Sequence, residues 1–471
     1  MDIKTKVKVC KFGGTSMANA ETITQVAEII KADKSRKFVI VSAPGKRQAS
    51  DIKVTDLLYA CADMRGKKFA KVFYNNKNFK LEFEKVKGRF FDIIKKCKQK
   101  IDLDLDAEYD IINSWMDWYE HEAQTDNIRD YFASRGEYLA GKVMAQILGY
   151  EFIDSAEIIK FDDKGNFLSE VTHDLCRKKL AKVKIGAVIP GFYGSVYNSK
   201  SPHFDVRTFS RGGSDVTGAI IAGAADAEIY ENWTDVDGFM KCDPRIVNNP
   251  KLIDMLTYKE LRELSYMGAN VLHPDSIFPV RAADISINIR NTFNPGHEGT
   301  LIVPTKRFIK GDYKREHSDI TGIAGKKDFV AINVEKSMMN NEVGFVRRIL
   351  QVLEDDGISI EHIPTGIDTI CVVVEKSQFK GSFSIQKVVD DIRKECEPDT
   401  ITVVENIALI AVVGHGMTAR KGAAADVCGA LADSDINIRM IDQGSSELNI
   451  IVAVDNKDFE KALQSLYERL A

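Results

Sequence analysis

The chain has 471 residues, which is more than one hydrophobic core usually serves, so we expect two or three domains. Hydrophobic residues make up 44% and charged residues 28% of the sequence, as is ordinary for a globular protein. The formal net charge is only -4 and the two signs are interspersed, which argues against nucleic acid or a membrane surface as a partner.

The eight cysteines form no CxxC pair and lack the neighbouring histidines that a zinc site would use, so we interpret them as reduced thiols. The N-terminus alternates Lys and Val instead of placing a charged stub before an apolar stretch, and no apolar window approaches the length of a membrane span. These observations predict a cytoplasmic protein that holds no metal through its own side chains.

The first part of the chain predicts strands that alternate with helices. Residues 6–12 alternate as a strand, glycines follow, and apolar residues then recur at helical spacing over 23–30. A short apolar run at 38–41 is typical of a strand buried on both faces. Similar strands followed by glycine loops or helices are expected at 185–190, 228–233 and 285–289. This order favours an α/β fold with a mainly parallel sheet and helices on both faces.

Residues 64–132 are rich in Lys, Phe and acidic residues with few turn signals, and we predict a mostly helical excursion there. The C-terminal part contains an internal repeat at one constant offset, in which each copy runs glycine, amphipathic helix, short strand, turn and second strand. Such αβ units need a neighbour to bury their sheet, so the repeat suggests paired sensor modules. The matched positions are Gly344, Leu353, Ile358, Ser359, Ile360, Ile363 and Gly366 with Gly422, Leu431, Ile436, Asn437, Ile438, Ile441 and Gly444.

Three glycine loops carry the candidate chemistry. In the first, Lys11 ends a buried strand and Gly13 and Gly14 follow, so that backbone amides and a buried ammonium could meet a phosphate; a plain tight turn remains the alternative. The second loop, 210–215, leads into a helix that Ser214 could cap. The third loop is 190–194. We expect all three loops at the ends of strands in one sheet, where α/β folds bind their ligands.

Two further segments join these loops. Residues 134–137 are predicted to open a helix, in which Glu137 would either complement the helix dipole or bind a ligand. Residues 234–245 follow the strand predicted at 228–233. The planar fork of Arg211 suits a carboxylate presented in a bidentate manner.

Taken together, these segments resemble the aspartate kinases of the amino acid kinase superfamily, and the resemblance covers nearly the whole chain. It implies a three-layer amino acid kinase fold followed by two α+β ACT domains. The reaction would be phosphoryl transfer from Mg-ATP to the β-carboxylate of aspartate, the first step toward lysine, threonine and methionine. The residues that carry the resemblance are 11–16, 42–44, 134–137, 211–215, 234–245, 271–274 and 444–447.

The resemblance also implies roles for single residues. Lys11 would stabilise the transition state, aided by the loop amides, and Asp215 would orient Lys11. Arg211 would hold the α-carboxylate of aspartate and Glu137 its α-ammonium, with Ser42, Thr55 and Ser214 nearby. The nucleotide would lie at Gly13, Gly14, Ser16, Thr234, Asp235, Met240, Arg245 and Asn270.

Two of these positions depart from the family pattern. Met240 stands where a tyrosine is common, and Asn270 replaces a lysine that commonly reaches the phosphates, so a charge-assisted contact of roughly 1.5 to 3 kcal/mol would be lost unless Lys241 substitutes. Mg²⁺ would arrive with ATP, mostly coordinated by water.

By the same resemblance, residues 1–303 would be the catalytic domain, 304–327 a linker with the first strand of the second ACT domain, 328–399 the first ACT domain and 400–471 the second. The chain would form a homodimer or a dimer of dimers through these domains, with an inhibitory amino acid between chains. Glu361 favours lysine over threonine as this effector. The effector residues would be Met339, Gly344, Phe345, Val346, Ser359, Ile360, Glu361 and Thr365.

Other functions remain open at this point. The acceptor could be glutamate, a carbamate or a nucleoside monophosphate, although Arg211 with Glu137 favours a free amino acid. A function of another class is also possible, in which the protein is a non-catalytic amino-acid sensor with a degenerate nucleotide pocket. A dinucleotide-binding oxidoreductase is disfavoured, because no GxGxxG with a downstream acidic residue follows a strand.

Overall fold

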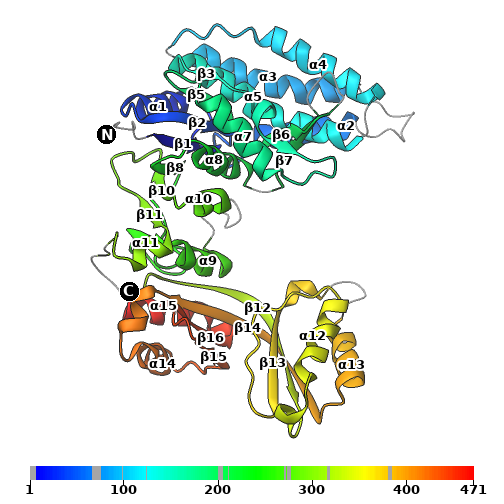
Figure 1. Ribbon diagram of the computed structural model, residues 1–471, viewed down its shortest axis with the longest axis vertical. Helices are drawn as coiled ribbons and strands as arrows, with labels where there is room; N and C mark the ends of the chain where they lie inside the picture. Colours follow the sequence, from blue (N-terminus) through cyan, green and yellow to red (C-terminus); the bar gives the residue numbers. More distant parts are fainter. Residues whose placement is uncertain are drawn as a thin grey trace. The chain divides into compact units, whose positions relative to one another are not determined.

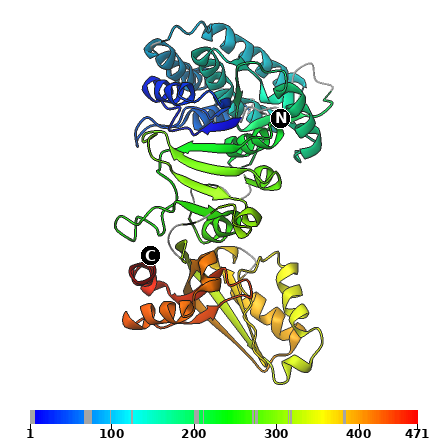
Figure 2. The same cartoon turned by 60° about the vertical axis from the view of Figure 1, so that its left-hand side comes forward.

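The computed structural model describes residues 7–65, 76–97, 99–122, 125–199, 205–210, 212–269, 272, 277–313, 315, 319–379 and 384–471 (Figures 1 and 2). The chain divides into two units. The first comprises 1–239, 254–258 and 270–314, and the second comprises 240–253, 259–269 and 315–471.

The first unit is built on an eight-stranded sheet with the order β3-β5-β2-β1-β8-β10-β11-β9. Neighbours from β3 to β10 run parallel, and only β10 and β11 are antiparallel, which confirms the predicted mainly parallel sheet. The strands are β1 (Lys8–Phe12), β2 (Arg36–Val41), β3 (Glu151–Phe152), β5 (Ala187–Pro190), β8 (Ile229–Thr234), β9 (Met255–Thr257), β10 (Ser286–Asn291) and β11 (Thr300–Val303).

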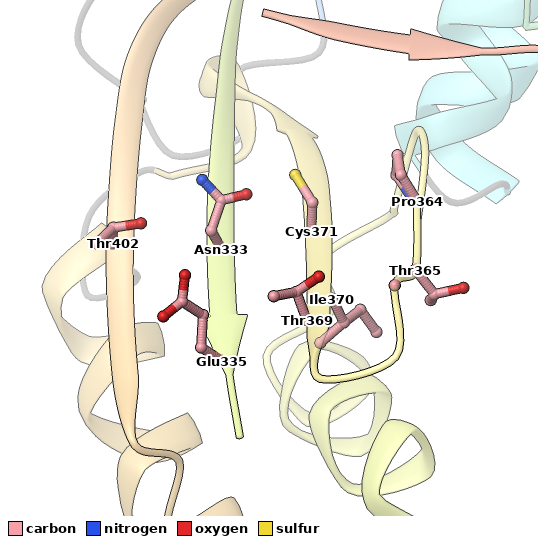
Figure 3. Close-up of a pocket in the computed structure, with 9 residues that line it drawn as sticks. Asn333, Glu335, Pro364, Thr365, Thr369, Ile370, Cys371 and Thr402 are labelled. Carbon is pink, nitrogen blue, oxygen red and sulfur yellow. The ribbon is translucent and has the colours of Figure 1, made fainter. Parts of the chain in front are cut away.

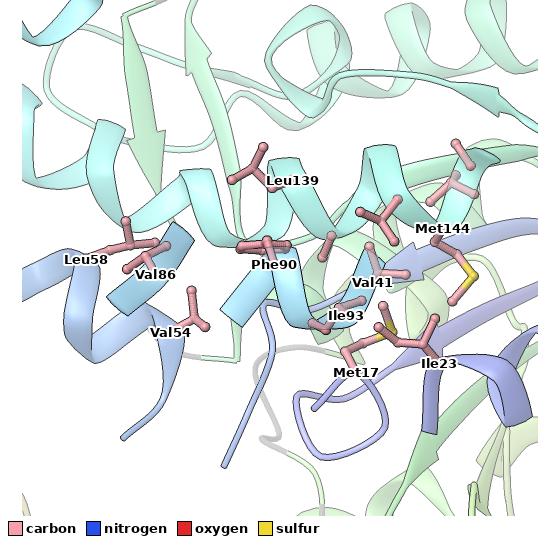
Figure 4. Close-up of a cluster of buried hydrophobic side chains, with 14 of the residues drawn as sticks. Met17, Ile23, Val41, Val54, Leu58, Val86, Phe90, Ile93, Leu139 and Met144 are labelled. Carbon is pink, nitrogen blue, oxygen red and sulfur yellow. The ribbon is translucent and has the colours of Figure 1, made fainter. Parts of the chain in front are cut away.

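Side chains of β1 and β2 alternate between the two faces of this sheet. Cys10, Phe12, Val39 and Val41 enter a core with five helices that contact one another (Figure 4). Those helices are α1 (Ala20–Lys31), α2 (Val54–Arg65), α3 (Asn76–Lys96), α4 (Leu105–Glu122) and α5 (Thr125–Leu148). A second helix group, α7 (Ser169–Leu180), α8 (Gly213–Ala224) and α10 (Phe278–Ala282), packs through α8 against β1, β2 and β8.

The excursion predicted at 64–132 is helical in the part of it that the structure describes, with α3 and α4 as its main elements. It contributes Val86 and Phe90 to the core beside α2 and α5 (Figure 4). The prediction that residues 134–137 open a helix is wrong, because α5 already begins at Thr125. Ile128, Tyr131 and Phe132 are buried and extend the helical apolar face upstream of Ser134.

Smaller elements complete the first unit. A three-stranded sheet has the order β4-β6-β7. The remaining elements are β4 (Lys160–Phe161), β6 (Tyr193–Val196), β7 (Val206–Thr208), α6 (Ser155–Ile158), α11 (Thr305–Ile309) and α9 (Tyr258–Tyr266), most of which belongs to the second unit.

The second unit contains a five-stranded antiparallel sheet with the order β13-β12-β14-β16-β15. Its two longest strands run through both halves: residues 322–326 of β12 pair with 409–413 of β14, and 331–335 pair with 400–404. The strands are β12 (Gly322–Glu335), β13 (Thr369–Glu375), β14 (Thr400–Val413), β15 (Met440–Asp442) and β16 (Asn449–Asp455).

The predicted repeat is visible in this unit. Gly344 (φ 86°) precedes α12 and Gly422 (φ 91°) precedes α14, both in the left-handed region that favours glycine. The copies differ where a short strand was predicted: the second has β15, whereas the first has only the isolated pairs His362–Val373 and Thr365–Ile370. The helices are α12 (Phe345–Asp355), α13 (Ile385–Cys396), α14 (Ala423–Asp433) and α15 (Phe459–Leu470), with 3₁₀ turns at Met339–Asn341, Lys376–Gln378, His415–Ala419 and Asn456–Asp458.

All eight cysteines are free. Within the described ranges, no helix combines the length and the apolar character that crossing a bilayer requires. The same residues contain no group of three or more His, Cys, Asp or Glu side chains that could hold a metal ion.

Candidate active site

Lys11 lies near the end of β1 and is only 8% exposed. Its Nζ is 2.7 Å from Oδ1 of Asp215, in the first turn of α8, and donates to Oδ1 of Asn232 at 3.3 Å. Asn232 lies opposite Lys11 on β8 and donates through Nδ2 to the same Asp215 oxygen at 2.9 Å. Two strands and one helix therefore fix the buried ammonium, and the carboxylate makes its burial tolerable.

The glycine loop after β1 brings backbone close to this ammonium. A side chain added at Gly13 would lie 3.6 Å from Nζ of Lys11. The amide of Gly13 donates to the carbonyl of Trp233 at 3.1 Å, so this amide is already engaged within the protein and is not directed to a ligand. Gly14 accepts from the amide of Gly45 at 2.8 Å, and a Cβ at Gly45 would approach the Gly14 carbonyl carbon to 2.6 Å. The loops after β1 and β2 thus touch backbone to backbone.

Glu137 is buried in the middle of α5, with 5% of its surface exposed. Burial raises the pKa of its carboxyl to about 8, although the amide of Ala43 and the charge of Arg135 act in the opposite direction. Its Oε2 has no hydrogen-bond partner among the described residues. A buried carboxyl with one unused oxygen is chemically suited to an ammonium group.

The other two glycine loops meet at the start of α8. Gly191, after β5, donates to the carbonyl of Val41 at 2.9 Å, and a Cβ there would lie 2.6 Å from Oγ of Ser214. The suggested capping role of Ser214 is wrong, because the N-cap is Gly212 (φ 56°) without a side-chain cap. The loop at 210–215 follows β7, a strand of the small sheet, so the expectation that all three loops extend from one sheet is also wrong.

The remaining predicted substrate residues lie around the loop after β2. The amide of Ser42 donates to the carbonyl of Phe12 at 3.1 Å, which holds this loop against the end of β1. Thr55 is partly exposed in the first turn of α2. Arg211 is outside the described residues.

The predicted nucleotide residues are dispersed over both units. Ser16 is fully buried with its Oγ 2.8 Å from Oγ1 of Thr292, and the hydroxyl of Thr234 donates to Oδ1 of Asp235 at 3.2 Å. Met240 and Arg245 belong to the second unit, where Arg245 is exposed and pairs with Asp243 at 2.6 Å. Asn270 is outside the described residues, as are Val271, His273 and Pro274.

Several polar residues at these strand ends were missed by the sequence analysis. Asn232 contacts both members of the predicted catalytic pair, and Thr292 contacts Ser16. Asp237, which lies in the predicted segment 234–245 but was given no role, accepts from the side-chain amides of Asn291 and Asn294 at 2.9 and 3.1 Å. The neutral polar residues near the ends of β8 and β10 could have been predicted as site residues. Neighbouring parallel strands end at the same edge of the sheet, where ligands bind.

The predicted effector residues lie at the start of α12 and in the segment after it. Met339 and Phe345 are buried in the core of this repeat, Val346 and Ile360 pack against that core, and Gly344 is the N-cap of α12. The backbone of Ser359 is held by the side chain of Gln378. The carboxylate of Glu361 accepts a hydrogen bond from the hydroxyl of Tyr266, which together with burial raises the pKa of Tyr266.

A cavity of about 390 Å³ opens on the sheet of this repeat (Figure 3). Among the predicted effector residues, Thr365 alone lines it. Figure 3 shows Asn333 and Glu335 on β12 facing the cavity between Thr402 of β14 and the Pro364–Thr365 loop. Its lining residues are Asn333, Glu335, Pro364, Thr365, Gly366, Thr369, Ile370, Cys371 and Thr402.

The fold and this site define an α/β phosphotransferase that carries a duplicated C-terminal module. A lysine fixed at the carboxyl end of a parallel strand, glycine loops around it and a buried carboxyl that suits an ammonium are the parts that phosphorylation of an amino acid needs.

Comparison with known proteins identifies the family to which the chain belongs. The model of the amino acid kinase family matches residues 6–291, and an ACT domain model matches 410–470. Aspartokinase 3 of Bacillus subtilis (strain 168) is 34% identical over 98% of both chains. The crystal structure of Clostridium acetobutylicum aspartate kinase is 44% identical with a TM-score of 0.82, covering 98% of this chain and 99% of that one. The chain belongs to the aspartokinases of the amino acid kinase family, enzymes that phosphorylate the side-chain carboxylate of aspartate.

Two E. coli aspartokinase III structures share the fold. The complex of that enzyme with aspartate and ADP, described as the R-state, is 24% identical with a TM-score of 0.71 and covers 99% of this chain and 100% of that one. Its complex with lysine and aspartate, described as the T-state, is 23% identical with a TM-score of 0.69 and covers 98% and 99%.

Proposed function

We propose that Lys11 is the residue of this aspartate kinase that stabilises the phosphoryl group in transfer from ATP to the β-carboxylate of aspartate. The observation that carries the proposal is the ammonium fixed by Asp215 and Asn232 beside Gly13. The acceptor is already an anion, so no general base is needed. Catalysis then consists of bringing two anions together and neutralising their charge.

Glu137 would bind the α-ammonium of aspartate and Arg211 its α-carboxylate. The unused Oε2 of Glu137 supports the first assignment, because an ammonium would supply the partner that this buried oxygen lacks among the described residues. Ser42, Thr55 and Ser214 would line the same site, and they lie on the loop after β2, the first turn of α2 and the start of α8.

ATP would bind along the loops after β1 and β8, at Gly14, Ser16, Thr234 and Asp235, with Met240, Arg245 and Asn270 completing the site. Mg²⁺ would be held chiefly by the phosphates and water, because this ion keeps several waters when it binds with a nucleotide. When bound, the ion supplies charge neutralisation to the phosphates. Lys11 supplies a fixed cation from the protein itself.

Lysine is the proposed feedback effector, bound around Glu361 between two copies of the chain in a homodimer or dimer of dimers. The carboxylate of Glu361 accepts a hydrogen bond from the hydroxyl of Tyr266. The ammonium of a bound lysine would be a stronger partner for this carboxylate. The E. coli relative whose structure contains lysine has the same fold.

The test of the catalytic proposal is Lys11→Ala with Lys8→Ala as the matched control. Lys8 is on the same strand but pairs with Asp33 at 2.9 Å, away from the Asp215 contact. We expect Lys11→Ala to lower kcat by about 10²- to 10³-fold, as for loss of one preorganised donor, and Lys8→Ala to retain kcat. Thermal unfolding of both variants separates a folding defect from a catalytic one. A folded Lys11→Ala enzyme with near-normal turnover would refute the role.

A further inference from the structure

A second cavity lies in the first unit, and none of the residues proposed to bind aspartate lines it. Its volume is about 220 Å³, and it is lined by Ile111, Ile112, Tyr131, Arg135, Tyr138, Asp154, Ala156 and Val206. None of these residues belongs to the proposed substrate or nucleotide site. We call this cavity the Arg135 pocket.

Arg135 is the charged centre of the pocket, and it is 94% buried, since only 6% of its surface is exposed. Its guanidinium lies 4.5 Å from the ring centres of Tyr131 and Tyr138 and 5.4 Å from that of Tyr193. These aromatic faces hold the cation in place without neutralising it.

The guanidinium has more donors than its protein partners use. Nε and Nη2 both donate to one atom, Oγ of Ser134, at 3.2 and 3.0 Å. Among the described residues no carboxylate lies within 4.0 Å of Arg135. The nearby charge of Asp154 stabilises the cation electrostatically. A guanidinium carries five N–H donors, and a buried cation that makes no direct ion pair is costly. The remaining donors therefore favour an anionic group in the pocket.

Asp154 supplies the opposite charge on another wall of the same cavity. Its Oδ1 accepts from the hydroxyl of Tyr193 at 2.8 Å and from the amide of Ala156 at 2.9 Å, which fixes the carboxylate at the start of α6. Both of these hydrogen bonds use Oδ1, so Oδ2 is the oxygen that a ligand could use.

The other walls are apolar, formed by Ile111, Ile112 and Val206. The volume is below the roughly 300 to 1,000 Å³ of pockets for drug-sized ligands, so the occupant is small. A guanidinium matches a carboxylate in a bidentate manner, and a carboxylate matches an ammonium. A ligand with a carboxylate, an ammonium and a short apolar branch would match Arg135, Asp154 and the apolar walls.

We propose that the Arg135 pocket binds a small zwitterionic amino acid with an aliphatic side chain, its carboxylate on Arg135 and its ammonium on Asp154. The lining of this cavity includes none of Lys11, Glu137 and Glu361, so the proposed ligand is distinct from the aspartate and lysine proposed above. Its lining residues come from α4, α5, β7 and the start of α6.

The probe is L-valine, titrated calorimetrically into the full-length enzyme in saturating aspartate so that the substrate site is filled. We expect saturable binding of valine that is lost with valinamide, which lacks the carboxylate, and with N-acetylvaline, which lacks the ammonium. Absence of valine binding, or equal binding of either analogue, overturns the proposal.

Two variants locate the site. Arg135→Met removes the cation, and Ile111→Trp places a larger ring at a residue that is 47% exposed, which closes the pocket without touching its charges. Both should lower valine affinity at least tenfold. Ile111→Trp should also still phosphorylate aspartate, because it leaves in place the charge of Arg135 that acts on Glu137. The matched control is Arg129→Met, since Arg129 is an exposed arginine of the same helix that stacks on Tyr59. Valine binding that survives Ile111→Trp, or that is lost equally in Arg129→Met, contradicts the assignment.

Discussion

At the scale of single residues, Glu137 is a carboxyl whose protonation is set by burial. With a pKa of about 8, it is mostly protonated at neutral pH in the free enzyme. An ammonium placed beside it would favour the carboxylate. Binding of aspartate is thereby linked to release of a proton, if Glu137 is the ammonium site.

This linkage predicts proton release on aspartate binding at pH 7, measured by titration calorimetry in buffers with different ionisation enthalpies. Glu137→Gln should abolish the buffer dependence and weaken aspartate binding by about tenfold or more, the value of one charge-assisted hydrogen bond. The control is Glu108→Gln, since Glu108 is also buried but already pairs with Lys142. Equal buffer dependence in wild type and Glu137→Gln would rule out this residue as the proton source.

The same carboxyl predicts how stability changes with pH. Its folded-state pKa is raised from the ordinary 4.5 to about 8, so between these values the folded state binds the proton that the unfolded state has lost. The free energy of unfolding of the ligand-free enzyme should therefore fall as pH rises from about 4.5 to about 8. Chemical denaturation across this range should show a flatter profile in Glu137→Gln, and an unchanged slope would contradict the shift.

The charged members of the site were predicted better than the neutral ones. Burial of Lys11 indicated an anionic partner, and the family resemblance implied Asp215, which lies 2.7 Å from its Nζ. Asn232 could not be predicted in this way, because a neutral amide can lie on either face of a sheet. Its contact with Lys11 follows only from the pairing of β1 with β8. The roles of the predicted substrate and nucleotide residues stay predictions.

At the scale of elements, the site depends on loops that touch through glycine. A Cβ at Gly45 would lie 2.6 Å from the backbone of Gly14, and one at Gly191 would lie 2.6 Å from Oγ of Ser214. Real side chains do not tolerate such distances to backbone, so the loops after β1 and β2 would have to separate.

We therefore expect Gly45→Ala to lower kcat/KM at least tenfold and to lower Tm, both by displacing the loop that follows Lys11. Gly88→Ala is the control, because Gly88 is exposed on α3 and a Cβ there meets nothing within 4 Å. Alanine in a helix interior is favoured over glycine by roughly 0.5–1 kcal/mol, so this variant should be slightly more stable. Steady-state kinetics and thermal melts distinguish the two outcomes, and a fully active Gly45→Ala enzyme would contradict the proposed loop contact.

Hydrophobic periodicity predicted element type but not every boundary. The strand at 38–41 was predicted from its unbroken apolar run, and the helical excursion from its composition and its few turn signals. The start of α5 was not, since serine, arginine and glycine at 134–136 look like a helix opening. In the structure Gly136 is small enough to pack against Ala43, where a Cβ would lie 2.7 Å from the Ala43 side chain. The glycine marks a close approach instead of a helix end.

At the scale of the whole molecule, the proposed lysine control depends on Glu361 in the second unit. Glu361→Gln should raise the lysine concentration for half-inhibition by about tenfold or more, through loss of one charged partner, and leave uninhibited kcat unchanged. Glu354→Gln, an exposed acidic residue on α12, serves as the control. Kinetics with lysine or threonine as inhibitor provide the readout, and inhibition by threonine alone would refute lysine as the effector.

The sequence predicted an α/β domain followed by two copies of a smaller module, because the repeat has a constant offset and follows the α/β pattern. The interleaving of the two units was not predicted, since residues 240–253 and 259–269 join the C-terminal part through packing that no local pattern reveals. Cys242 and Val247, for example, are buried in the core formed by α14, α15 and the sheet beside them.

The two 14-residue strands β12 and β14 pass through both copies of the repeat. Each copy consequently borrows backbone from the other, and truncating the chain between them would leave both with an incomplete sheet. Neither copy could therefore be removed alone without leaving unpaired strand edges in the copy that remained.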